Sequence, residues 1–107
     1  MKILFSAQNQ GWDAQLDERF GRCPGFLLYD EEKDDLTWHP LDSNVEHGAG
    51  IGAGQKAVDL KADVVITNNL GPKAKQILDS AGIKQVVTSK IDTIRKLYEA
   101  YKKGELG

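Results

Sequence analysis

The stretch Asp63-Val-Val-Ile-Thr-Asn-Asn-Leu-Gly-Pro72 decides the fold of this 107-residue chain. Its residues 64–66, Val-Val-Ile, form a short apolar run that is typical of a parallel strand covered on both faces. Residues 67–70 are predicted to form the turn out of that strand, and Pro72 stands at the first position of a helix, where proline is favoured. The stretch therefore predicts a buried strand that leads directly into a helix.

Helical patterns lie on both sides of this strand. Upstream, Ala53, Ala57 and Leu60 recur at helical spacing, and this pattern ends near Ala62. Downstream, an apolar stripe predicts a second helix that stops at Gly82, because glycine accepts the left-handed conformation of a helix end. The stripe consists of Ala74, Ile77, Leu78 and Ala81.

The C-terminal part of the chain repeats the order of a strand and then a helix. Residues 86–87, Val-Val, predict a last short strand. In the helix that follows, Asp92 or Thr93 is the predicted cap and Gly104 the predicted end, and residues 105–107 are expected to fray. Its apolar side, which is predicted to belong to the core, comprises Ile94, Leu97, Tyr98 and Tyr101.

The N-terminal part predicts three more strands. Residues 2–7 contain a contiguous apolar run, and residues 26–29 and 36–39 flank a charged turn, so the last two are expected to form a hairpin. In the third strand Leu36 and Trp38 share a face, while His39 points the other way. Together with the later alternation of strands and helices, this order predicts one α/β domain over residues 1–107, with a five-stranded mixed sheet and helices on both faces.

Composition and charge exclude several classes of protein. The net charge of −2 and the spread of Lys and Arg along the chain predict no nucleic-acid partner. The apolar start is too short for a signal peptide or a membrane span, which predicts a cytoplasmic protein with no membrane partner. Cys23 is the only cysteine, so it cannot form an internal disulfide or supply the paired ligands of a zinc finger.

Three loops are expected to meet at the carboxyl ends of the parallel strands, where ligands bind in open α/β sheets. They cover residues 8–23, 44–55 and 67–72. The second contains four of the chain's eleven glycines, and we interpret it as a loop whose exposed N–H groups bind an anion. The candidate cofactor-binding residues are Arg19, Arg22, Asn44, Gly48, Gly50, Asn68 and Asn69, and the candidate metal ligands are His47 and Cys23.

Each candidate also has a purely structural interpretation. Arg19 could simply pair with Asp17, and one of Asn68 and Asn69 could be a turn residue that tolerates left-handed backbone angles. Cys23 could be a small buried hydrophobe. For His47, which lies beside the glycines, a role as a metal ligand and a purely structural role both remain open.

Catalytic sets are not apparent. Asp13, Asp17, Asp30 and Asp63 could in principle hold magnesium, but Asp63 lies at the wrong end of its predicted strand. The chain has no phosphate-loop or dinucleotide fingerprint, and a nucleophile pair of Cys23 with a histidine has no supporting local signature. These observations predict a binding protein, not an enzyme.

Three segments together resemble a known family: residues 17–26 (Asp-Glu-Arg-Phe-Gly-Arg-Cys-Pro-Gly-Phe), 47–51 (His-Gly-Ala-Gly-Ile), and 64–72 followed by Ala74. They are similar to the dinitrogenase iron-molybdenum cofactor biosynthesis family, which includes NifX-like and NifB-tail-like domains. The resemblance implies a ribonuclease H-like motif without the nuclease carboxylates. It also implies an accessory or cofactor-assembly protein that binds or carries an iron–sulfur or molybdenum-containing cluster between donor and acceptor proteins.

Two other functions remain open from the sequence. The chain could be a cofactor-free regulatory module that presents its surface to a partner protein. It could also be an enzyme, either a metal-dependent nuclease of ribonuclease H-like fold or a hydrolase that uses Cys23. A homodimer would bring two Cys23 thiols to one cluster, but no segment of the sequence identifies an interface.

Overall fold

The computed structural model describes residues 1–41 and 49–106, which form an α/β fold with a five-stranded mixed sheet and three helices. The described helices are all too short or too polar to cross a membrane. Along the chain the elements are β1 (Lys2–Ala7), β2 (Gly25–Asp30), β3 (Asp35–Pro40), α1 (Ala49–Asp59), β4 (Val64–Thr67), α2 (Pro72–Ser80), β5 (Lys84–Val87) and α3 (Ile94–Lys102).

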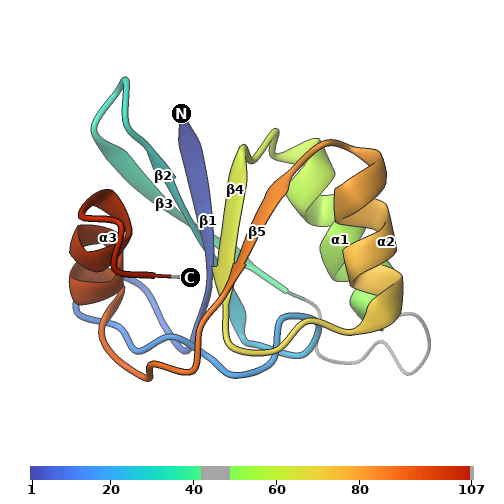
Figure 1. Cartoon of the computed structure of the whole chain (residues 1–107), viewed down its shortest axis with the longest axis horizontal. Coiled ribbons are helices and arrows are strands. Elements are labelled where there is room, and N and C mark those ends of the chain that lie inside the picture. The colour runs from blue at the N-terminus through green and yellow to red at the C-terminus, as the bar shows by residue number, and fades with distance from the viewer. Residues whose placement is uncertain (42–48, 107) are drawn as a thin grey trace.

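The sheet has the strand order β3-β2-β1-β4-β5, and its two halves differ in direction (Figure 1). The hairpin β2-β3 and the pair β1-β2 are antiparallel, while β4 runs parallel to both β1 and β5. The segment that decided the fold behaves as predicted, because Val65 pairs with Leu4 on one side and Gln85 on the other. The prediction of a mixed five-stranded sheet is therefore confirmed.

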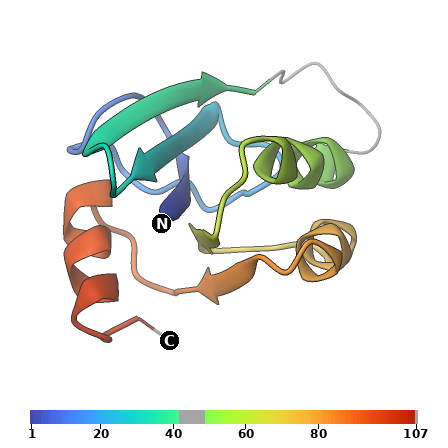
Figure 2. The same ribbon diagram turned by 90° about the horizontal axis from the view of Figure 1, so that it is seen from above.

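The helices cover the two faces of the sheet separately (Figure 2). On one face α1 and α2 pack through Ala53, Ala57 and Leu78 against Leu4 and Val65. On the other face α3 packs its apolar side against a second group of buried residues that includes Ile3, Phe5 and Val86. Because both faces are covered, the parallel strands can be apolar throughout, which explains the Val-Val-Ile run of β4.

The glycine-rich segment differs from its prediction as a loop. Helix α1 begins at Ala49, so Gly50, Gly52 and Gly54 are helical, although glycine disfavours helix by about 1 kcal/mol relative to alanine. Tertiary packing overrides that preference, because Ala53 and Ala57 are fully buried against the sheet. Gly54 has a packing role as well, since a Cβ atom there would lie 3.2 Å from Ile77 Cβ on α2.

Gly52 offers a test of this helix. A Cβ atom at Gly52 would meet no described atom within 4 Å, so alanine should fit without strain. We expect Gly52→Ala to raise the free energy of unfolding by about 0.5–1 kcal/mol, because alanine loses less backbone entropy on folding. Urea denaturation measures the change. Gly54→Ala is the comparison, and an equal gain at Gly54 would contradict the close packing of α1 on α2.

The start of α3 and the ends of α2 and α3 lie where the sequence predicts them. Thr93 caps α3 by accepting a hydrogen bond from the Lys96 N–H, and Gly82 and Gly104 adopt positive φ angles of 72° and 73° after α2 and α3. The C-terminal tail, which was predicted to fray, is held in place at Leu106. Leu106 is buried against the α3 side of the sheet, so its apolar surface holds the segment in place.

Candidate functional site

The carboxyl ends of β1, β4 and β5 lie along one edge of the sheet, and both α1 and α2 begin at the same edge (Figure 1). From β1 the chain proceeds to β2 on one side, whereas from β4 it proceeds to β5 on the other side. Such a reversal point is where ligands bind in open α/β sheets. The loops that cover residues 8–23 and 67–72 follow β1 and β4 at this edge.

A pair of buried hydroxyl groups joins β1 and β4 under this edge. Ser6 and Thr67 are completely buried, and their hydroxyl oxygens share a hydrogen bond of 2.8 Å. Ser6 Oγ lies 2.8 Å from the carbonyl oxygen of Asp17, and Asp17 N–H donates to the carbonyl oxygen of Ser6, also at 2.8 Å. The loop that follows β1 is thus fastened to the strand ends at Asp17. The sequence signal for this feature is a hydroxyl residue directly after each apolar strand run.

Asp17 holds Arg19 in a fixed position. Its carboxylate is buried and accepts hydrogen bonds from Arg19 N–H at 2.8 Å, Nε at 3.2 Å and Nη2 at 3.3 Å. These contacts confirm the alternative that Arg19 pairs with Asp17, and they raise the pKa of the Arg19 guanidinium. The Arg19 side chain nevertheless remains 62% exposed, so its outer N–H groups can still meet a ligand.

The loop after β1 also reaches the loop after β4. Arg19 and Asn69 form an isolated parallel bridge, and Phe20 N–H donates to the carbonyl oxygen of Asn69 at 3.4 Å. Asn69 and Arg22 are both exposed. Two of the three predicted loops therefore converge. The other predicted site residues, Asn44, His47 and Gly48, lie outside the described residues, and Gly50 lies in the first turn of α1.

Asn68 has a different role from Asn69. Its Nδ2 donates to the carbonyl oxygens of Thr88 and Lys90, which ties the loop after β4 to the loop after β5. Only Oδ1 is left, and this buried acceptor has no partner among the described residues. An acceptor does not attract an anion, so Asn68 as placed here does not suit the anion contact predicted for it.

Cys23 lies in the core beneath the same loop. Its side chain is 1% exposed, and its Sγ donates to the carbonyl oxygens of Phe20 at 3.4 Å and Gly25 at 3.3 Å. Burial, followed by the charge of Asp17, raises the pKa of the thiol to about 12. The thiol is therefore protonated near neutral pH, whereas a metal ligand must be a thiolate.

The burial of Cys23 predicts low reactivity. Iodoacetamide attacks the thiolate, so we expect the native protein at pH 8 to resist alkylation and the urea-unfolded protein to react completely. Mass spectrometry of the two samples after equal exposure measures the difference. Rapid alkylation of the native chain would show that Cys23 leaves the core.

Helix α2 contributes an open N-terminus to this edge. Its N-cap residue is Gly71, which has no side chain, and no described side chain caps the helix. By contrast, Thr93 caps α3. The uncapped N–H groups and the positive end of the helix dipole favour an anion at Gly71, close in sequence to Asn69.

The acids considered for magnesium do not come together. Asp17 is committed to Arg19, and Asp63 lies at the amino end of β4, where its carboxylate accepts a hydrogen bond from Lys2 N–H at 2.7 Å. Within residues 1–41 and 49–106 there is no group of three or more His, Cys, Asp or Glu side chains that could hold a metal ion. The described edge is rich in hydrogen-bond donors and cations, an inventory suited to binding an anion.

Comparison with known proteins agrees with this architecture. The high-resolution structure of the apo form of the orange protein from Desulfovibrio gigas superimposes with a TM-score of 0.92 at 32% identity, covering 99% of this chain and 90% of that one. The NMR structure of a Thermotoga protein described as NifB-like gives a TM-score of 0.86 at 23% identity, covering 98% and 90% of the two chains, which shows the same fold.

Sequence comparison gives the family. A protein of Methanocaldococcus jannaschii is 27% identical over 104 residues, which cover 92% of this chain and 85% of that protein. The family model described as dinitrogenase iron-molybdenum cofactor matches residues 1–104, which is nearly the whole chain. The chain therefore belongs to the dinitrogenase iron-molybdenum cofactor family.

Proposed function

We propose that this protein binds or carries an anionic metal–sulfur cluster, iron–sulfur or molybdenum-containing, as an accessory or cofactor-assembly protein. The cluster is its cargo, received from a donor protein and passed to an acceptor. Membership of the family supports a role in handling the iron-molybdenum cofactor. The observation that carries the proposal is the convergence of Arg19, Asn69 and the uncapped start of α2 at the reversal point of the sheet.

Charge complementarity supports a preassembled cluster more than a bare metal ion. The described edge supplies a guanidinium, an exposed amide and helix N–H groups, which bind sulfide or oxo groups through charge-assisted hydrogen bonds. A bare cation would instead need several convergent anionic or imidazole ligands. The residues present therefore fit a cluster that arrives with its own charge and its own bridging atoms.

Each candidate residue has a distinct part in the proposal. Arg19 and Arg22 neutralise the cluster, and Asn69 donates a hydrogen bond from its side chain. Asp17 is a positioning residue that holds the Arg19 guanidinium. Asn44, Gly48 and Gly50 are proposed to contact the cluster and His47 to be its metal ligand, although Asn44, His47 and Gly48 lie outside the described residues. Cys23 is a core residue.

The fold that carries this site is proposed to be a ribonuclease H-like motif that has lost its nuclease carboxylates. The strand order β3-β2-β1-β4-β5 with one antiparallel hairpin supports this assignment. The placement of Asp63 at the amino end of β4, away from the loops, supports a non-catalytic use of the fold.

Anaerobic reconstitution tests the proposal. The purified chain is incubated with ferrous iron, sulfide and tetrathiomolybdate and then separated from small molecules by gel filtration. We expect a chromophore and metal to elute with the protein, and the His47→Ala variant to retain less metal. Elution of the protein without metal, while the reagents elute separately, would refute the proposal.

A further inference from the structure

The outer edge of β5 is an open strand edge. Strand β5 is the last strand of the sheet, and in the part of the chain that the structure describes no strand pairs with its outer side. Lys84 N–H and Thr88 N–H donate inward to Asp63 and Thr67 on the β4 side, each at 3.0 Å. Because backbone direction alternates along a strand, the N–H and C=O groups of Gln85 and Val87 point outward.

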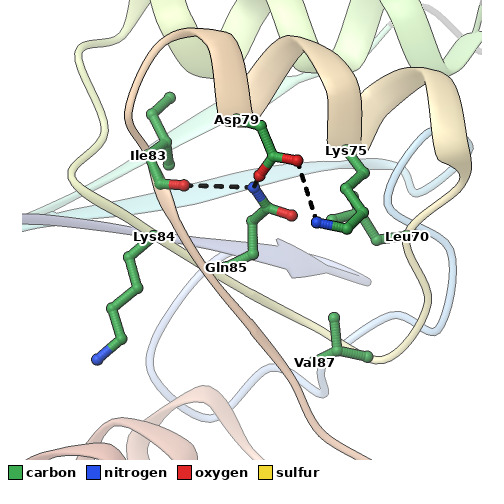
Figure 3. A pocket seen from close by; sticks show the side chains of 7 residues that line it. All are labelled: Leu70, Lys75, Asp79, Ile83, Lys84, Gln85 and Val87. Carbon is green, nitrogen blue, oxygen red and sulfur yellow. Dashed lines mark hydrogen bonds and ion pairs between the residues drawn. The ribbon is translucent and has the colours of Figure 1, made fainter.

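A surface groove lies along this open edge, between β5 and α2 (Figure 3). Its volume is about 410 Å³. Val87 is 53% exposed in it, and Lys75 and Asp79 of α2 form an ion pair of 3.1 Å with side chains 59% and 56% exposed. The remaining residues that line the groove are Leu70, Ile83, Lys84 and Gln85.

We propose that this groove is the interface of a homodimer in which β5 pairs antiparallel with β5 of a second copy. A two-fold axis at Val86 places Gln85 of each copy opposite Val87 of the other. Both residues have outward N–H and C=O groups, so this register satisfies all of them with hydrogen-bonded pairs. The two sheets then join into one continuous sheet of ten strands.

The charges of the groove favour a second copy as the occupant. Asp79 lies at the level of Gln85, because Gln85 Nε2 donates to Asp79 Oδ1 at 2.6 Å (Figure 3). Lys75 lies one helical turn away toward the Val87 end, because α2 runs opposite to β5 (Figure 1). The two-fold axis exchanges these ends, so Lys75 of each copy faces Asp79 of the other. The surface is therefore complementary to itself, as a two-fold interface requires.

This dimer keeps the two proposed cluster sites apart. Strand β1 is separated from the interface by β4 and β5, so the two β1 strands are five strand spacings apart, or about 24 Å. The dimer therefore does not bring two Cys23 thiols to one cluster, and it forms whether or not the chain binds metal.

Charge reversal provides the test, with sedimentation velocity of the full chain as the measurement. The wild type is expected to form a dimer that dissociates on dilution. Lys75→Glu and Asp79→Lys are each expected to weaken self-association by at least about tenfold, because two attractions across the interface become two repulsions. Mixing the two variants is expected to restore a dimer, because each supplies the charge that the other lacks.

Two further variants separate the interface from general effects. Lys96→Glu disrupts an ion pair between Lys96 of α3 and Asp92, which precedes that helix, and is expected to dimerise like the wild type. Val87→Pro removes an outward N–H that β4 does not use, so it is expected to stay folded by circular dichroism and become monomeric. A wild type that is monomeric up to about 1 mM would overturn the proposal, as would single variants that dimerise as well as the wild type.

Discussion

Gly25→Ala is expected to destabilise the protein by about 1–3 kcal/mol, because β2 has no room for a Cβ atom at this position. A Cβ at Gly25 would lie 2.6 Å from Trp38 Cζ2 and Cη2 and 2.9 Å from the carbonyl oxygen of His39 on the neighbouring strand. The indole can shift only by leaving the face of the hairpin that it covers, and the backbone oxygen is fixed by the strand pairing. Thermal unfolding followed by circular dichroism measures the effect.

The control for Gly25→Ala is the same substitution at Gly52, which is expected to raise the free energy of unfolding and not to lower it. The double variant Gly25→Ala/Trp38→Leu replaces the indole by a smaller side chain. It should be destabilised less than the sum of the two single variants, because the contact between the new Cβ and the Trp38 ring is absent. Gly25→Ala with wild-type stability would show that the hairpin lies further from residue 25 than described.

Arg19→Gln combined with Arg22→Gln is expected to lower the affinity for the reconstituted cluster by about a hundredfold or more. Each guanidinium lost from an anion removes a charge-assisted hydrogen bond worth about 1.5–3 kcal/mol. Titration of the protein with tetrathiomolybdate and ferrous iron under argon, followed by its visible absorption, measures the affinity.

Two comparison variants make this result specific. Arg95 pairs through Nε with Asp13 Oδ1 at 3.2 Å, the same atoms and distance as in the Arg19 pair, so Arg95→Gln is the matched control for the single variant Arg19→Gln. Asp17→Asn with Arg19→Gln keeps the net charge and leaves no buried unpaired carboxylate, so it isolates the guanidinium itself. Equal affinity in the wild type and this second variant would contradict a role for Arg19.

The order of elements was predictable because it depends on local patterns. The apolar run of β4, the helical stripe of α2 and a cap at Asp92 or Thr93 are each readable from a few neighbouring residues. The structure has the strand and the helix, and Thr93 is the cap, but Ala81 of the predicted stripe is exposed beyond the end of α2. The convergence of the loops after β1 and β4 followed from a topological rule that requires only the strand directions.

Features that depend on distant contacts were not predictable. Glycines 50, 52 and 54 disfavour helix, and only the sheet beneath Ala53 and Ala57 makes the segment helical. The bridge of Arg19 to Asn69 joins residues 50 positions apart, and the burial of Cys23 depends on how the loop after β1 folds back over the core. No pattern in a single sequence contains these distances.

The metal and acid-labile sulfide content of the chain, purified from its host without exposure to air, is the most direct test of cluster binding. We expect iron or molybdenum together with sulfide in a fixed ratio to the protein, and loss of both from the variant with Gln at positions 19 and 22. Protein that carries neither metal nor sulfide, and takes up neither on anaerobic reconstitution, would contradict a role as a cluster carrier.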